Sequence, residues 1–306
     1  MEATKEARLN RAINSLQGLS VGDAFGEKFF VHPDVAENLI NLRAMPSGVW
    51  YYTDDTQMAL SIVSILQQYQ EINQDELAKS FAEYYDIERG YGAAMHRLLT
   101  EIRDNNTNWR QLAGNLFNGQ GSYGNGAAMR VAPLGAYFAD NIELLVEQAL
   151  KSAEVTHMHP EAIAGAVAVA CAAGIVSKSI PTKQQFFNEV INYTPESEVK
   201  SKIQRASELS ETISIENAAA ILGNGTKISA QDTVAFALWC AAQYLDNYTE
   251  ALWTTVRGLG DRDTTCAIVG GIVAGSVGAD TIPKEWLQAR EALPVDFYHR
   301  DTGYTE

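Results

Sequence analysis

The sequence predicts an all-α protein, because apolar residues recur at helical spacing along most of its length and strand-like alternation of useful length is missing. Glycines such as Gly90, Gly223 and Gly278 follow these segments, as they commonly do where helices end. No linker or low-complexity tract divides the chain, so we expect one domain over residues 1–306. The segments expected to be helical are Ala7–Leu19, Thr56–Tyr69, Leu77–Tyr85, Ala93–Ile102, Ile142–Ser152, His159–Val176, Gln185–Ile191, Thr233–Leu245, Leu252–Arg257 and Thr264–Val277.

Two stretches are expected at the centre of the fold. Ala162–Val176 and Cys266–Gly278 are rich in alanine and glycine and poor in large side chains. Small residues let neighbouring helices approach closely, which suits a crowded interior. By contrast, the polar section Thr194–Ser214 carries charges of both signs and is expected to form an exposed helix.

The charge balance argues against several classes of partner. Lys and Arg total 23 against 38 Asp and Glu, a formal net charge of −15. Nucleic acids and anionic membranes are bound through basic side chains, so we expect neither as a partner, although a local basic patch or a backbone-held anion stays open. Cys171, Cys240 and Cys266 are far apart in apolar surroundings, which indicates buried thiols. Without a signal-peptide pattern or a bilayer-length apolar run, the expected location is cytoplasmic.

The stretch YYTDDTQMALSIV places acidic residues at the start of an apolar helix. Thr53 has the chemistry of an N-cap, and Asp54 and Asp55 then fall in the first turn, where the helix dipole favours carboxylates. Helix capping alone is sufficient to explain this pattern.

The stretch RGLGDRDTTCAIVGG repeats the pattern late in the chain, with Asp261, Asp263 and Thr264 at the start of a small, apolar helix. Capping again suffices for this motif taken alone. If the two helix starts met, however, their carboxylates would repel one another unless cations lay between them. Ligands that are all oxygen favour a hard metal such as Mg²⁺, Mn²⁺ or Ca²⁺ over Zn²⁺, and two ions about 3.5–4 Å apart would fit such a cluster.

A glycine-rich segment, GQGSYGNGAAMRVAPLG, offers a candidate anion site. Glycine together with Ser122 and Asn125 can direct successive N–H groups toward a phosphate, and the helical pattern that follows would add a helix N-terminus. An ordinary turn explains the same composition equally well. The segment lacks the Walker GK[ST] ending, which argues against a P-loop NTPase.

The stretch THMHPEAIAGA brings His157 and His159 just before an apolar helix that Pro160 can open. Metal ligation by the histidine pair is one interpretation. Helix capping or a hydrogen bond to substrate is the stronger one, because no cysteine accompanies the pair in the motif.

Together, TDDT, GSYGNGAAMR, THMHP and GDRDTT resemble the motifs of the ADP-ribosylglycohydrolase family, in the same order. The likeness extends from GLSVGDAFG near residue 18 to IPKEWL near residue 282. It implies an all-α, single-domain orthogonal multi-helix bundle with a dinuclear metal cleft that holds two Mg²⁺ or Mn²⁺ ions. The metal ligands implied by the resemblance are Thr53, Asp54, Asp55, Asp261, Asp263 and Thr264. The implied substrate-binding residues are Gly92 in the loop GYGAAM, Gly121, Ser122, Tyr123 near the adenosine, Gly124, Asn125, Gly126 and His157.

Two positions depart from the family pattern. Phe30 stands where the family often has a glutamate used as a gate or for proton transfer, and Glu27 lies earlier in the same loop. Either Glu27 takes that role or this chain works without it. Arg262 stands between Asp261 and Asp263, where a small residue is more usual. Its cation either opposes the metal ions or points outward.

The expected function is metal-dependent hydrolysis of the N-glycosidic bond that links ADP-ribose to an arginine side chain. Asp54, Asp55, Asp263 and Glu27 are the expected catalytic residues, through metal binding and proton transfer. The expected partners are an ADP-ribosylated protein as substrate and ADP-ribose as product. Two alternatives stay open: hydrolysis of ADP-ribosylserine or of free ADP-ribose derivatives, and non-catalytic binding of ADP-ribose.

Overall fold

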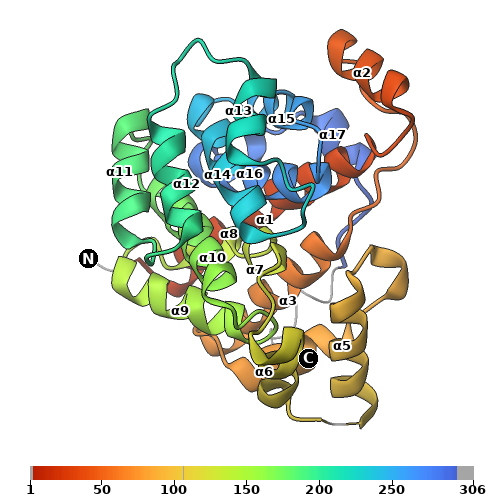
Figure 1. The fold of residues 1–306 in the computed structure, drawn as a ribbon, viewed down its shortest axis with the longest axis vertical. Coiled ribbons are helices and arrows are strands. Elements are labelled where there is room, and N and C mark those ends of the chain that lie inside the picture. The colour runs from red at the N-terminus through yellow and green to blue at the C-terminus, as the bar shows by residue number, and fades with distance from the viewer. Residues whose placement is uncertain (1–2, 106, 295–306) are drawn as a thin grey trace, which may run out of the picture.

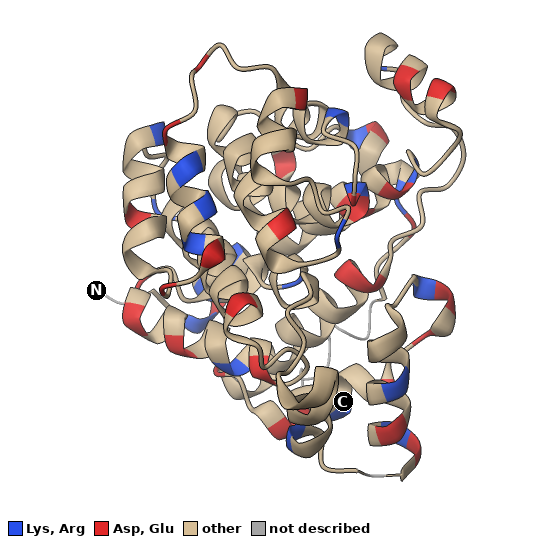
Figure 2. Cartoon of the chain, viewed as in Figure 1, with Lys and Arg blue, Asp and Glu red and all other residues tan. Residues whose placement is uncertain are grey.

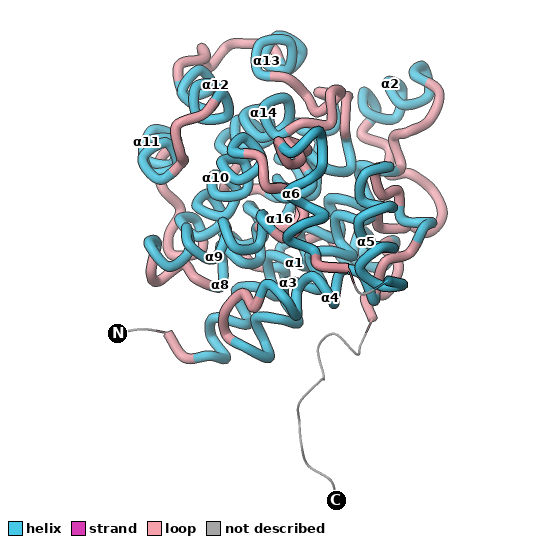
Figure 3. The backbone as a smooth tube through the Cα atoms, turned by 60° about the horizontal axis from the view of Figure 1, so that its bottom comes forward, coloured by secondary structure: helices cyan, strands magenta, loops and turns pink. Residues whose placement is uncertain are grey.

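The computed structural model describes residues 3–105 and 107–294, and within them the regular elements are all helices (Figures 1 and 3). The all-α prediction is therefore confirmed. In chain order the helices are α1 Lys5–Glu27, α2 Pro33–Leu42, α3 Asp54–Tyr69, α4 Gln74–Glu83, η1 Ile87–Arg89, α5 Ala93–Asn105, α6 Trp109–Gly119, α7 Gly126–Met129, α8 Ala132–Tyr137, α9 Ile142–Glu154, α10 Pro160–Val176, α11 Lys183–Tyr193, α12 Glu198–Ser207, α13 Ile215–Leu222, α14 Ala230–Gln243, α15 Tyr248–Arg257, α16 Arg262–Val277, η2 Ala279–Thr281 and α17 Lys284–Ala289.

The predicted helices are present, with shifted ends. The largest difference is in α1, which was expected to stop at Leu19 and continues to Glu27. Its second half is buried on every side, so the one-sided apolar pattern that marks a surface helix is missing there. The sequence analysis did not predict the short helices α2, α6, α13 and α17. The polar section Thr194–Ser214 contains α12, which buries one apolar face and leaves the other exposed.

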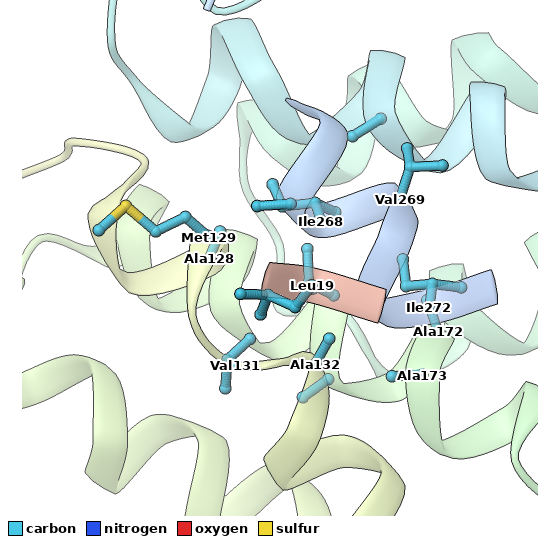
Figure 4. Packing of buried hydrophobic residues seen from close by; sticks show 14 of the residues in the cluster. Leu19, Ala128, Met129, Val131, Ala132, Ala172, Ala173, Ile268, Val269 and Ile272 are labelled. Carbon is cyan, nitrogen blue, oxygen red and sulfur yellow. The ribbon is translucent and has the colours of Figure 1, made fainter. Parts of the chain in front are cut away.

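The two alanine- and glycine-rich helices do lie at the centre, as predicted, and α1 joins them there (Figure 4). Leu19 of α1 lies among buried residues of α8, α10 and α16, including Ala132, Ala172 and Ile272. The N-terminal and C-terminal parts of the described chain thus share one core. Whether residues 1–306 form a single domain stays a prediction, because residues 295–306 lie outside the described residues.

The contact between α1 and α16 is made backbone to backbone. Gly18, Gly22 and Gly26 form one ridge of α1, and a Cβ added at these positions would stand only 2.3, 2.1 and 2.2 Å from carbonyl oxygens of α16. Two hydrogen bonds between helices support this core, from Ser15 Oγ to the Gly271 carbonyl at 2.8 Å and from Tyr248 to the Gly18 carbonyl at 2.7 Å. This close approach brings the end of α1 to the start of α16.

We expect Gly22→Ala to lower the free energy of unfolding by about 3 kcal/mol, because its methyl group would overlap the Cys266 carbonyl and force the helices apart. Gly114→Ala in α6 is the matched control, since its Cβ would stand 3.4 Å from the flexible Met158 side chain. Chemical denaturation of both variants measures the difference. Equal stability of Gly22→Ala and the unmodified protein would contradict the described helix contact.

The surface carries acidic residues on most helices, with fewer basic residues among them (Figure 2). The helix α2 projects from the body of the fold (Figure 1) and buries only Ala36 and Ile40. Across the described ranges, none of the helices has both the length and the hydrophobicity needed to span a bilayer. The three cysteines are buried free thiols, as predicted.

Candidate active site

A cavity of about 450 Å³ opens where the starts of α3 and α16 face the glycine-rich loop. It collects most of the residues singled out from the sequence, which come from widely separated parts of the chain. The predicted site residues among its lining are Asp54, Asp55, Gly92, Ser122, Tyr123, Gly124, Asn125, Gly126, His157, Asp261, Asp263 and Thr264. Thr53, Gly121 and Glu27 are not among the residues that line it.

The aspartates of α3 and α16 influence one another through space. Burial raises the pKa of Asp55 well above its usual value, and the neighbouring carboxylates, Asp23 and Asp263 among them, raise it further. Burial likewise raises the pKa of Asp54 to about 7 and that of Asp263 well above its usual range. From the sequence alone, it was open whether the two helix starts lie close together. The structure brings them together.

Two carboxylate oxygens in this cluster have no hydrogen-bond partner among the described residues. Oδ1 of Asp55 and Oδ1 of Asp263 are both buried and unpaired. A buried unpaired carboxylate oxygen is strongly unfavourable unless a proton or a cation meets it. Oxygen-only surroundings suit a hard divalent cation, so the residues fit one. In the described ranges, however, no three His, Cys, Asp or Glu side chains form a ready-made metal cage, and a dinuclear centre stays a proposal.

Neither acidic motif is capped by the side chain of its own N-cap residue, although Asp54, Asp55 and Asp263 do stand in the first turns of α3 and α16. Thr53 occupies the N-cap position of α3, but its side chain does not cap the helix. Asp261 occupies the same position of α16 and also makes no side-chain cap. In both motifs the side chains that would normally cap are directed to other partners.

For α3 the cap comes from another helix. Asp23, buried near the C-terminal end of α1, accepts hydrogen bonds from the backbone N–H of Thr53 at 2.9 Å and of Thr56 at 3.1 Å. It also accepts from the hydroxyl groups of Thr53 at 2.8 Å and Thr56 at 2.5 Å. Burial nevertheless raises the pKa of Asp23 to about 6. The sequence analysis missed this residue, although an aspartate within the small, apolar run GLSVGDAFG was an available sign.

At the start of α16, Asn125 holds the first aspartate in place. Its side-chain amide donates to Asp261 Oδ2 at 2.7 Å and to Thr233 Oγ1 at 3.0 Å. Both of its N–H groups are therefore used within the protein. Its amide nitrogen thus joins the glycine-rich loop to the acidic motif, while substrate binding by Asn125, which lines the cavity, stays a prediction.

Arg262 points away from the carboxylates, which answers the question its position raised. Its guanidinium donates to the Phe29 carbonyl and lies 5.0 Å from the centre of the Phe30 ring. It therefore ties the segment after α1 to the start of α16. Glu27, the last residue of α1, is partly buried, and burial together with the negative charges of Asp23 and Asp261 raises its pKa to about 6.

The glycine-rich loop is shaped by positions that accept no side chain. Gly121 has φ +76°, and a Cβ there would stand 2.8 Å from the His159 backbone nitrogen. Tyr123 is exposed, with its ring 5.7 Å from that of Phe117. The expected helix N-terminus after the loop is only the single turn α7, Gly126–Met129, so a helix dipole contributes little to an anion site here.

The two histidines have separate roles. His159 caps α10, with Nδ1 accepting from the Glu161 backbone N–H at 3.2 Å, and Pro160 begins that helix as predicted. His157 is buried and lines the cavity beside the glycine-rich loop. The geometry favours capping for one and substrate contact for the other over shared metal ligation.

Comparison with known proteins agrees with this arrangement. The sequence model of the ADP-ribosylglycohydrolase family matches residues 4–302. The chain belongs to the ADP-ribosylglycohydrolase family. Among curated relatives, ADP-ribosylhydrolase ARH3 of Homo sapiens is 27% identical, with 92% of this chain and 90% of the relative aligned. The Mus musculus ARH3 is 26% identical over 93% of this chain and 88% of the relative.

One further relative and one solved structure are similar to this chain. The ADP-ribosyl-[dinitrogen reductase] glycohydrolase of Rhodospirillum rubrum is 24% identical over 91% of this chain and 89% of the relative. A solved structure titled ADP-ribosylglycohydrolase-related protein complex superimposes with a TM-score of 0.69 and 24% identity, covering 94% of both chains. That likeness shows that the fold is the all-α fold of the family.

The raised pKa values predict how pH affects divalent-cation binding. Protons occupy these carboxyls up to about neutral pH, since the pKa of Asp54 is raised to about 7, and a cation must displace them. The increase in melting temperature produced by Mg²⁺ should therefore grow from about pH 5 to about pH 8. Thermal denaturation with Mg²⁺ and with EDTA at each pH measures it. A Mg²⁺-induced increase in melting temperature of the same size at about pH 5 and about pH 8 would contradict binding of the cation by these carboxyls.

Proposed function

We propose that this chain is a divalent-cation-dependent hydrolase that releases ADP-ribose from modified protein side chains. The observation that carries the proposal is the buried carboxylate cluster, whose unpaired oxygens on Asp55 and Asp263 lie on the wall of the same cavity as the glycine-rich loop. Membership of the ADP-ribosylglycohydrolase family supports the choice of substrate class.

The proposed metal ligands are the aspartates at the starts of α3 and α16, together with two threonine hydroxyls. Thr53 Oγ1 donates its proton to Asp23 or Asp55, which leaves its lone pairs available to a cation. When bound, divalent cations supply Lewis-acid polarisation and lower the pKa of a ligated water. The full proposed ligand set is Thr53, Asp54, Asp55, Asp261, Asp263 and Thr264.

The opposite wall of the cavity is proposed to hold the ADP-ribose. The backbone of residues 121–126 faces the diphosphate, Tyr123 and Phe117 offer aromatic faces to the adenosine, and Gly92 leaves room beside the ribose, since a Cβ there would meet nothing within 4 Å. Lys227 is the one Lys or Arg among the described lining residues. Because the aspartates dominate the charge, cations are needed to attract a diphosphate.

The comparisons do not favour arginine as the linked side chain. Relatives named ADP-ribosylhydrolase ARH3 align at 26% and 27% identity, above the 24% of the dinitrogen reductase glycohydrolase. We therefore place ADP-ribosylserine and free ADP-ribose derivatives first among the substrates to test, and ADP-ribosylarginine second. A cytoplasmic location stays a prediction.

We propose Glu27 as the group that accepts the proton of the attacking water. Its raised pKa of about 6 leaves it mostly ionised above neutral pH, so kcat/KM should rise with pH through this range. Glu27→Gln should lower kcat about a hundredfold and remove that rise. Initial rates between about pH 5 and pH 8 measure both effects. Wild-type rates in the variant would exclude Glu27 as the proton acceptor. They would also show that Glu27 does not replace the glutamate that the family often has at the position of Phe30.

The deciding experiment follows release of ADP-ribose from serine-, arginine- and aspartate-linked peptides side by side by mass spectrometry. We expect release from at least one linkage with Mg²⁺ or Mn²⁺ and loss of release in EDTA. Equal release in EDTA would overturn the metal dependence. Binding of ADP-ribose without release from any linkage would favour the non-catalytic alternative. The two unpaired carboxylate oxygens argue against that alternative, because a site that only binds ADP-ribose gains nothing from them.

A further inference from the structure

His157 is placed unusually close to the glycine-rich loop. It lies between α9 and α10, and its side chain is almost completely buried. A Cβ at Gly126 would stand 3.0 Å from His157 Nε2, and one at Gly124 would stand 3.2 Å from the same nitrogen. The ring therefore presents its Nε2 edge to the loop at positions where only glycine leaves room, and the cavity is on the same side.

A buried arginine lies behind this histidine. Arg130 is completely buried and donates from Nη2 to the Ser152 carbonyl at 3.0 Å and to Thr156 Oγ1 at 2.9 Å. Its guanidinium lies over the Phe81 ring at 4.5 Å, and Arg130 is not among the residues that line the cavity. A buried cation is unfavourable unless hydrogen bonds or opposite charges compensate for its lost hydration. Its hydrogen bond to Thr156 links it to the histidine, and its charge also acts through space on Asp54 of the cavity wall.

The hydrogen bonds determine which ring nitrogen of His157 carries the proton. An arginine only donates, so Thr156 Oγ1 accepts from Arg130 and still has its own proton to give. Oγ1 lies 2.6 Å from His157 Nδ1, and among the described residues no other acceptor is hydrogen-bonded to this hydroxyl. The hydroxyl thus donates to Nδ1, which must be unprotonated. A neutral imidazole with a bare Nδ1 carries its proton on Nε2.

Electrostatics supports the neutral ring. Burial, together with the positive charge of Arg130, lowers the pKa of His157 to about 3. The imidazole is accordingly uncharged over the whole range in which the enzyme is expected to work, and the nearby carboxylates do not draw a proton onto it.

We propose that Arg130 and Thr156 are positioning residues that hold His157 as a neutral donor, with Nε2–H directed at an oxygen of the ligand beside the glycine-rich loop. The choice of ligand, a phosphate or ribose oxygen of ADP-ribose, rests on the proposed function. The direction of the donor does not. A fixed neutral donor is ready before the ligand arrives, which avoids reorientation on binding.

The test reads the tautomer directly. Long-range ¹H–¹⁵N spectra of the full chain labelled at histidine report the protonation of each ring nitrogen, and a His157→Asn sample assigns the signals. We expect a bare Nδ1 and a protonated Nε2 without any ligand between about pH 6 and pH 8. A protonated Nδ1 in the unmodified protein would overturn the proposal whether or not ADP-ribose binds.

Two variants of Thr156 separate positioning from folding. Thr156→Val keeps the shape and removes the hydroxyl, while Arg130 retains the Ser152 carbonyl. We expect Thr156→Val to populate both tautomers of His157 and to weaken ADP-ribose binding about tenfold, measured by titration calorimetry. Thr156→Ser should restore the single tautomer and the affinity. Unchanged affinity in a folded Thr156→Val protein with mixed tautomers would overturn the role in binding. Absence of ADP-ribose binding in the unmodified protein would instead count against the proposed function.

Discussion

Asp55→Asn is expected to reduce release of ADP-ribose by at least about a hundredfold and to remove the Mg²⁺-induced rise in melting temperature. Oδ1 of Asp55 is buried and unpaired, and its carboxylate lies in the field of Asp23, Asp263, Asp54 and Asp261. An amide has the same shape but no charge for a cation. In EDTA the variant should be at least as stable as the unmodified protein, because the substitution removes one of several mutually repelling buried acids.

The matched control for this prediction is Asp75→Asn. Asp75 stands in the first turn of α4, as Asp55 does in α3, but it is exposed and pairs with Arg110 at 2.7 Å outside the cavity. It should leave both turnover and the Mg²⁺ effect unchanged. Turnover assays and thermal denaturation with Mg²⁺ and with EDTA compare the two variants. An Asp55→Asn protein that still responds to Mg²⁺ as the unmodified protein does would contradict the assignment.

Asp23→Asn is expected to weaken Mg²⁺ binding about 10- to 100-fold while preserving the fold. The amide oxygen can still accept the backbone N–H groups of Thr53 and Thr56, which caps α3. The amide nitrogen, however, would face Thr53 Oγ1 and donate to it, whereas the carboxylate accepts from it. One of the two lone pairs of the threonine oxygen would then be used, which weakens this oxygen as a ligand of the cation.

Two companion variants isolate this effect. Thr56→Val removes one hydroxyl that donates to Asp23 but leaves Thr53 untouched, so a much smaller loss of Mg²⁺ affinity is expected. Asp23→Ala removes every acceptor and should lower the free energy of unfolding by about 1–3 kcal/mol, since buried N–H groups are left unpaired. Titration calorimetry with Mg²⁺ and circular dichroism measure the two properties separately. Unaltered Mg²⁺ affinity in Asp23→Asn would show that Asp23 only supports the fold.

Part of the site was accessible from local pattern. Acidic residues at two helix starts, a glycine-rich loop and a histidine before a proline are each short-range features, and their residues do line the cavity. The orientation of Arg262 was not accessible, because a side chain at a helix start can point either way. Its contacts with Phe29 and Phe30 depend on how the end of α1 meets α16.

The sequence by itself determined the helical class, the central position of α10 and α16, and the chemistry available at each motif, because hydrophobic periodicity, alanine and glycine content and residue type are all encoded over a few neighbouring residues. Only the tertiary structure decided which motifs meet. The glycine ridge of α1 lets its backbone touch α16, and burial on all sides removes the periodicity that would have revealed this helix. The same contact brings Asp23 beneath α3, and the packing of α7 against α9 and α10 brings Arg130 to Thr156 behind His157. Such partners are distant in the chain, so no local pattern specifies them.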